Sequence, residues 1–122
     1  MMSQFSRKIT PFVESEIQLS QIHFENKDYE RAFQHLENAH VLGQESTWWH
    51  VKVHVLMFKW AFNRKDIKEM LGQIVRIVGA ATKTAIGLVP IGNTGGTNIS
   101  PFKPLPLKPD HQAAIQYAKE SN

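Results

Sequence analysis

The amino-acid sequence predicts an all-α protein, a four-helix bundle with a long loop rich in proline and glycine and a short C-terminal helix. Apolar residues recur at helical spacing in four long segments, good N-cap residues precede those segments, and the periodicity is lost between residues 87 and 109. With 122 residues the chain is long enough for its own core. We therefore expect one domain over residues 1–122, with 1–9 as an N-terminal arm and 87–109 as an extended loop.

The composition excludes several classes of protein. Hydrophobic residues make up 42% and charged residues 20% of the chain, as in globular proteins, so global disorder is not expected. There is no cysteine, which excludes disulfides, thiolate metal sites and cysteine nucleophiles and fits a cytoplasmic protein. The net charge of +3 and the scattered basic residues predict no specific nucleic-acid partner. Charged residues interrupt the most apolar stretches, so no membrane span is expected.

The first two predicted helices form a hairpin. The first starts at Thr10, a good N-cap that is followed by Pro11 at the first helical position, and it ends near Asn26. Asp28 opens the second helix, and Gly43 closes it as a left-handed cap. The buried stripe of this second helix comprises Tyr29, Ala32, Phe33, Leu36, Ala39 and His40.

A repeat-like pattern runs through this hairpin. Its residues are Leu19, Phe24, Asp28, Tyr29, Ala32, Leu36 and Ala39. Together they resemble a tetratricopeptide repeat, whose small alanines let paired helices approach closely, so the bundle is predicted to be tetratricopeptide-like. Gln44 stands where the repeat has a proline, and no second copy follows. Because a single unit cannot bury its own face, we do not expect a repeat array.

The third helix is predicted from Ser46 to about Arg64. At about 100° per residue, Lys52 and Lys59 share its exposed face. The opposite face, which we expect to point into the protein, carries His50, His54, Met57 and Ala61.

The fourth helix begins at Asp66, which is predicted to form a capping box with Glu69. Its predicted core face comprises Ile67, Met70, Leu71, Ile74, Ile77 and Val78, and its predicted solvent face comprises Glu69, Gln73, Arg76 and Lys83. The long loop that follows contains a turn at Asn93–Gly96. Asp110 then caps a last helix from His111 to about Lys119.

Two longer patterns point to a family. They are H-L-E-N-A-H-V-L-G-Q followed by H-V-K-V-H, and G-Q-I-V-R followed by P-I-G-N-T-G-G. Together they resemble an uncharacterised bacterial domain-of-unknown-function family of short proteins, over most of the chain beyond residue 28. The resemblance implies a small bacterial protein and supplies no catalytic residues.

Histidines and a glutamate predict a metal site between the second and third helices. His50 and His54 are four residues apart, so they are neighbours on one helix face and can bind one ion. Glu37 and His40 form a second pair at i, i+3 spacing, and the short connection makes the two helices antiparallel neighbours. The predicted ligands are therefore Glu37, His40, His50 and His54, with Glu69 in reserve, for zinc, iron, nickel or manganese.

Two functions remain open from the sequence. The first is a small protein that binds a divalent transition metal. The second is a non-catalytic, tetratricopeptide-like interaction module, in which the histidines are hydrogen-bonded structural groups and the exposed surfaces bind a protein partner or a second copy of the chain. No reaction is predicted, because the zinc-protease motif needs glutamate directly after the first histidine and Val51 follows His50.

Overall fold

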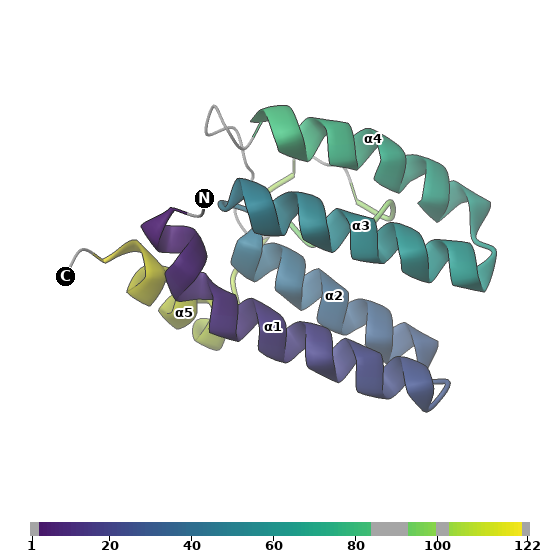
Figure 1. Cartoon of the computed structure of the whole chain (residues 1–122), viewed down its shortest axis with the longest axis horizontal. Helices are drawn as coiled ribbons and strands as arrows, with labels where there is room; N and C mark the ends of the chain where they lie inside the picture. The colour runs from purple at the N-terminus through teal and green to yellow at the C-terminus, as the bar shows by residue number, and fades with distance from the viewer. Residues whose placement is uncertain (1–2, 84–92, 100–102, 121–122) are drawn as a thin grey trace.

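The computed structural model describes residues 3–83, 93–99 and 103–120, and these residues form five helices. The helices are α1 (Gln4–Glu25), α2 (Tyr29–Gly43), α3 (Thr47–Arg64), α4 (Ile67–Lys83) and α5 (Pro109–Lys119). Figure 1 shows α1 to α4 side by side in chain order, with the short α5 against the N-terminal part of α1. The prediction of an all-α fold with four long helices and a short C-terminal one is confirmed.

Helix α1 begins earlier than the sequence analysis predicted. Ser3 is the N-cap, and its side chain accepts a hydrogen bond from the backbone N–H of Ser6. Thr10 is therefore not a cap; it lies inside the helix and donates its hydroxyl hydrogen to the Ser6 carbonyl oxygen. Pro11 is also internal and lacks the N–H of a regular helical position. The fully buried Ile9 anchors this first part of the helix, so most of the predicted N-terminal arm is helical.

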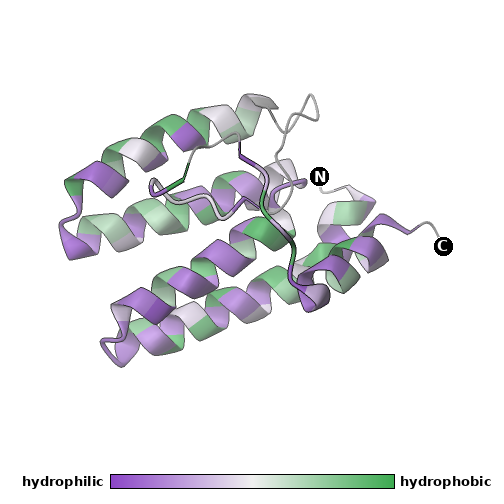
Figure 2. Ribbon diagram, turned by 180° about the vertical axis from the view of Figure 1, so that it is seen from behind, coloured by the Kyte–Doolittle hydropathy of each residue, from purple (hydrophilic) through white to green (hydrophobic). Residues whose placement is uncertain are grey.

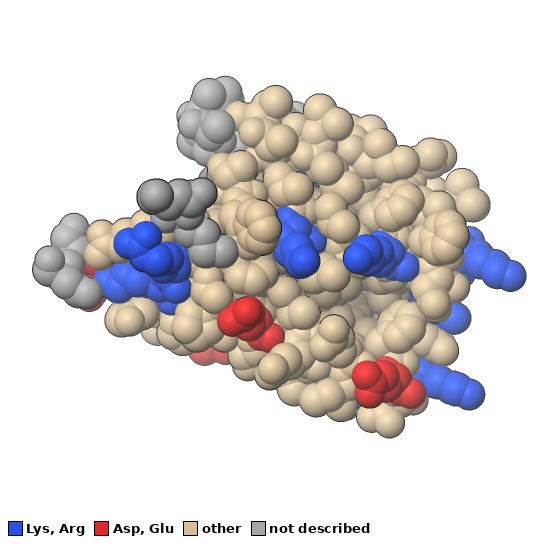
Figure 3. Space-filling model, in the orientation of Figure 1, with Lys and Arg blue, Asp and Glu red and all other residues tan. Residues whose placement is uncertain are grey.

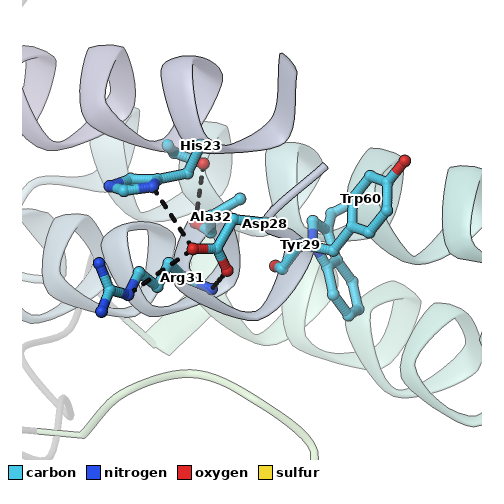
Figure 4. A network of polar contacts seen from close by, with 7 residues as sticks. His23, Asp28, Tyr29, Arg31, Ala32 and Trp60 are labelled. Carbon is cyan, nitrogen blue, oxygen red and sulfur yellow. Dashed lines mark hydrogen bonds and ion pairs between the residues drawn. The ribbon is translucent and has the colours of Figure 1, made fainter. Parts of the chain in front are cut away.

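The turn between α1 and α2 follows the prediction. Asp28 is the N-cap of α2 and accepts from the backbone N–H of Arg31. Its carboxylate also lies 3.6 Å from the Arg31 side chain and 3.8 Å from the ring of His23 (Figure 4). The Trp60 indole donates to the carbonyl oxygen of Tyr29, which ties this end of α2 to α3.

The connection between α2 and α3 is short, as predicted, but Gly43 is not a left-handed cap. The helix ends at Gly43, and the right-handed Gln44 follows as C-cap. Glycine is required here because the chain packs closely against Trp49: a Cβ at position 43 would lie 2.8 Å from Cβ of Trp49. The side chain of Ser46 then accepts from the backbone N–H of Trp49, which confirms Ser46 as the start of α3.

The hydrophobic core lies between α1, α2, α3 and α5. It comprises Ile9, Val13, Leu36, Ala39, Leu42, Trp49, Val53, Met57, Ala114, Ile115 and Ala118. The inner face predicted for α3 is confirmed, since its two histidines, Met57 and Ala61 are all buried. Among the described residues, α4 contributes none to this core cluster.

Helix α4 is rotated about its axis relative to the prediction, so that the face predicted to be buried is exposed and the face predicted to be exposed is buried. Asp66 does accept from the backbone N–H of Glu69, as a cap should. The predicted core face is largely exposed, because the side chains of Ile67, Leu71, Ile74 and Val78 are 48% to 64% exposed. Glu69 and Gln73, predicted to face solvent, are 8% and 0% exposed. The inner side chains of α4 bind residues 95–99 of the following segment, and this contact sets the orientation of the helix.

The described parts of the predicted loop, residues 93–99 and 103–108, have no regular helix or strand and cross the face seen in Figure 2. Residues 87–92 and 100–102 of that loop lie outside the described residues. Helix α5 starts slightly earlier than predicted, with Lys108 as N-cap and Pro109 at the first helical position, where a missing N–H costs nothing. Asp110 therefore lies in the first turn and is not the cap. None of the described helices is long and apolar enough to cross a membrane.

Candidate metal centre

Three histidines meet between α2 and α3. The ring centre of His40 lies 4.9 Å from that of His50 and 4.6 Å from that of His54, and the last two are 5.0 Å apart. One nitrogen from each ring can be chosen so that all three lie within 4.8 Å of one another. The rings are buried, with 2%, 8% and 2% of each residue exposed. Such a group can hold a metal ion.

The local sequence explains why the three rings meet. The four-residue spacing places His50 and His54 on one face of α3, and the Ser46 cap starts that helix one turn before His50. The short turn after Gly43 folds α3 back along α2, so His40 lies opposite them. This juxtaposition of His40, His50 and His54 agrees with the sequence prediction.

A backbone carbonyl sets the protonation of the His40 ring. Nδ1 of His40 lies 2.6 Å from the carbonyl oxygen of Asn93. A carbonyl oxygen can only accept a hydrogen bond, so Nδ1 carries the hydrogen. In the neutral ring, Nε2 of His40 therefore carries the lone pair that a metal needs.

The side chain of Gln73 sets the protonation of the His54 ring. Nδ1 of His54 lies 2.6 Å from Oε1 of Gln73. The amide nitrogen of Gln73 donates to Oε2 of Glu69 at 2.7 Å and to the carbonyl oxygen of Gly95 at 3.0 Å. Because both partners can only accept, the orientation of the amide follows from its contacts, and Oε1 must accept from Nδ1 of His54. Nε2 of His54 is then also a lone-pair nitrogen.

The two lone-pair nitrogens face each other. Nε2 of His40 and Nε2 of His54 are 3.1 Å apart. Burial lowers the pKa of His50 to about 3 and that of His54 to about 4, and burial together with the two neighbouring rings lowers the pKa of His40 well below its usual value. A shared proton is therefore disfavoured at neutral pH. Two facing lone pairs repel, and a cation bound by both nitrogens relieves that repulsion.

The polar face of α4 points inward because it forms hydrogen bonds with the partly buried segment 93–99. Oε1 of Glu69 accepts from the hydroxyl of Thr97 at 2.7 Å, and both carboxylate oxygens accept from its backbone N–H. Arg76 donates to the carbonyl oxygen of Ile99. Buried backbone groups need partners, and an apolar face would have left these unpaired. This requirement explains why the predicted solvent face of α4 is buried.

Gly95 closes the site over His40. It has a φ of +86°, and a Cβ at this position would lie 2.6 Å from Cδ2 of the His40 ring. The side chain of Asn93 accepts from the backbone N–H of Gly95 and donates to the carbonyl oxygen of Lys103, which shapes the turn. The glycine and asparagine of this motif thus form one wall of the histidine cluster. The sequence analysis predicted the turn but not its position.

A family model described as a protein of unknown function (DUF3703) matches residues 7–115. The chain belongs to this family. The resemblance to an uncharacterised family is therefore confirmed, and the match spans the three histidines, Gln73 and Gly95. Comparisons with curated proteins and with solved structures found no match. The tetratricopeptide likeness and the bacterial origin accordingly stay predictions.

The two carboxylates predicted as ligands in this DUF3703 chain, Glu37 and Glu69, are not part of the three-histidine group. No carboxylate of the described residues joins the group of three rings. Glu69 instead binds Gln73 and Thr97, so it acts on His54 through Gln73. Glu37 is half-buried, and burial together with the charge of Glu69 raises the pKa of its carboxyl to about 7. A role for Glu37 as a metal ligand stays a prediction.

Sequence reasoning missed Gln73, Asn93 and Gly95. The available signal for Gln73 was its position four residues after Glu69, which puts two hydrogen-bonding side chains on one helix face. That face looks like an ordinary solvent face in the sequence. Its use as an orienting group for His54 depends on which way α4 packs.

Proposed function

We propose that this protein binds one divalent transition-metal ion through His40, His50 and His54. The observation that carries the proposal is the pair of Nε2 atoms of His40 and His54, 3.1 Å apart while both Nδ1 atoms are engaged as donors. Two imidazole nitrogens that bind the same Zn²⁺ ion, each at about 2.0–2.1 Å, lie roughly 2.9–3.4 Å from each other. The spacing between the two rings therefore suits an ion bound by both.

The chemistry of the donors limits the choice of ion. Three imidazoles suit zinc, iron and nickel, whereas manganese prefers oxygen ligands and would need a carboxylate as well. Three protein ligands also leave one position of a tetrahedral site for a fourth ligand. We place Glu37 in that role, because it precedes His40 by about one helical turn on α2. The cysteine-free sequence further favours a cytoplasmic protein.

Elemental mass spectrometry tests the proposal. Untagged protein, purified without chelator, should carry close to one transition-metal ion per chain, and His50→Gln/His54→Gln should carry almost none. The matched control is His23→Gln/His35→Gln, which also removes two histidines. Those two rings stack on each other, 5.1 Å apart, and each contacts a carboxylate away from the centre. The control should keep its metal.

Two results would contradict the proposal. One is equal metal content in the two double variants. The other is wild-type protein that retains no ion after incubation with zinc, iron, nickel and manganese and removal of the excess. The second result would favour the interaction module with structural histidines. A Glu37→Gln variant separates the fourth-ligand assignment from the three-histidine site, since it should weaken binding without abolishing it.

The orienting role of Gln73 gives a second prediction. In Gln73→Met, which keeps a long side chain, Nδ1 of His54 loses its acceptor. Loss of such a partner typically costs about 10- to 100-fold in metal affinity. Titration of the metal-free protein with zinc measures this change, and circular dichroism checks that the helices are intact. Unchanged affinity in a folded variant would show that Gln73 does not orient the ligand.

A further inference from the structure

The outer face of α4 is apolar and uncovered. Its side chains are Ile67, Leu71, Ile74, Val75 and Val78, and they are 62%, 61%, 48%, 68% and 64% exposed. In Figure 3 the surface along α4, at the top of the molecule, shows neither basic nor acidic side chains. Monomeric proteins rarely leave apolar patches of more than roughly a few hundred Å² uncovered. This face therefore calls for a partner.

The helix cannot turn to bury this face within its own chain. The inner face of α4 is held by Glu69, Gln73 and Arg76, which bind Thr97, His54 and Ile99. Rotation of α4 would break these contacts and leave buried polar groups unpaired. The apolar face must then be covered from outside.

The spacing along this face is that of a helix-pairing seam. Ile67, Leu71, Ile74, Val78 and the exposed Ala81 follow one another at intervals of 4, 3, 4 and 3 residues. This is the heptad spacing at which two α-helices pack against each other. The seam spans about 21 Å at 1.5 Å per residue. The partner that fits it is therefore another apolar helix, and an extended peptide would not match this spacing.

We propose that two copies of this chain pair through α4 as an antiparallel, two-fold symmetric dimer whose axis passes between Leu71 and Ile74. The intervals of 4, 3 and 4 residues from Ile67 to Val78 are the same in either direction along the helix. Ile67 of one copy therefore meets Val78 of the other, and Leu71 meets Ile74. Each contact sets two apolar side chains against each other. The same patch is thus complementary to itself, as a two-fold interface requires.

Charge also favours a second copy. Of the described charged side chains of α4, Glu69 and Arg76 serve the inner contacts, and the exposed Lys68 lies about 100° round the helix from Ile67, beside the seam and not on it. An acidic or basic partner would find no counter-charge on the seam, whereas a second seam brings none to be paired. The antiparallel arrangement also places the opposite ends of the two helix dipoles beside each other.

Sedimentation equilibrium of the full chain tests the dimer, with two single variants and their combination. Leu71→Glu alone and Ile74→Lys alone should each give a monomer, because each buries an unpaired charge. Leu71→Glu/Ile74→Lys should dimerise again, because the antiparallel pairing brings each new glutamate to a new lysine. The matched control is Ile22→Glu, on α1, whose side chain is 53% exposed and lies off the seam. It should remain a dimer.

The changed side chains are exposed in the single chain, so the variants should fold, and circular dichroism checks this. A wild type that stays monomeric up to about 200 µM, well above a micromolar dissociation constant, would overturn the proposal. That result is also the one expected if a different protein covers the seam. Dimeric Leu71→Glu would place the interface elsewhere, and a monomeric double variant would overturn the antiparallel pairing.

Discussion

His40, His50 and His54 are bases that burial keeps neutral, and this has a consequence for stability. Their folded pKa values lie below the ordinary 6.5, at about 3 for His50, about 4 for His54 and in the same direction for His40. Between those values and 6.5, the unfolded chain binds more protons than the folded one. The free energy of unfolding therefore rises with pH across that window, and the stability is lost as pH falls below 6.5. The raised pKa of Glu37 acts in the opposite sense, with stability lost as pH rises towards 7.

We predict that the metal-free protein loses stability as pH falls from 7 to 4.5. Three buried rings outweigh one half-buried carboxyl, and each ring contributes up to about 1.4 kcal/mol per pH unit. Urea unfolding at several pH values measures the slope. His50→Gln/His54→Gln should give a clearly flatter profile than wild type. A wild-type profile that is flat over this range would mean that the rings are not held neutral.

At the scale of elements, α4 and the turn at residues 93–96 together form the outer wall of the histidine centre. α4 supplies Gln73 to His54, and the turn supplies the Asn93 carbonyl oxygen to His40. Gly95 makes this contact possible, because its φ of +86° and its closeness to the His40 ring exclude a side chain. A Cβ added at Gly79, on α4, would instead meet none of the described atoms within 4 Å.

These two glycines make a matched pair for mutation. Gly95→Ala should lower the free energy of unfolding by about 1–3 kcal/mol, through backbone strain and contact with His40, and should weaken zinc binding. Gly79→Ala should raise it by about 0.4–1 kcal/mol, because alanine favours a helix and restricts the unfolded chain. Denaturant unfolding and zinc titration measure both effects. Equal effects of the two changes would refute the close contact between Gly95 and His40.

At the scale of the whole molecule, the metal centre lies between the described core cluster and α4, which contributes no residue to that cluster. The described core cluster is built from α1, α2, α3 and α5, and Gln73 and Glu69 on the inner face of α4 form hydrogen bonds to His54 and Thr97. A metal bound by His40 on α2 and by His50 and His54 on α3 would fix the rings that α4 and the turn hold in place. Metal binding should then stabilise the outer wall more than the core.

Hydrogen exchange with and without zinc measures how much metal binding stabilises the outer wall and the core. Zinc at 100 times its dissociation constant should raise global stability by about 2.7 kcal/mol. The added protection should be greatest in residues 93–99 and on the inner face of α4, and smaller in α5, which packs mainly against α1. His50→Gln/His54→Gln should show no zinc effect. Equal added protection along the whole chain would contradict the prediction that the metal stabilises the outer wall more than the core.

Several elements could be predicted because their signals are local. The helical period of α3 placed its two histidines on the inner face, and Asp28, Ser46 and Asp66 were recognisable caps. The start of α1 was missed because Thr10 and Pro11 also make a good helix start locally. The buried Ile9 and the Ser3 cap extend the helix past that point.

The orientation of α4 could not be predicted from its pattern. Helical periodicity divides the helix into an apolar and a polar face, but it does not say which of them points inward. That depends on the segment 93–99, whose partly buried backbone groups bind Glu69 and Arg76. The apolar face consequently becomes a surface, and the polar face becomes part of the metal centre.

Residue spacing and short connections were sufficient to predict the helical fold, the hairpin between α2 and α3 and the meeting of His40, His50 and His54. Which nitrogen of His40 and of His54 faces inward, in contrast, depends on the packing of distant parts of the chain. The deciding partners are Asn93 and Gln73, which lie 53 and 19 residues from their histidines. Hydrogen bonds over such separations follow from packing, and no local pattern encodes them.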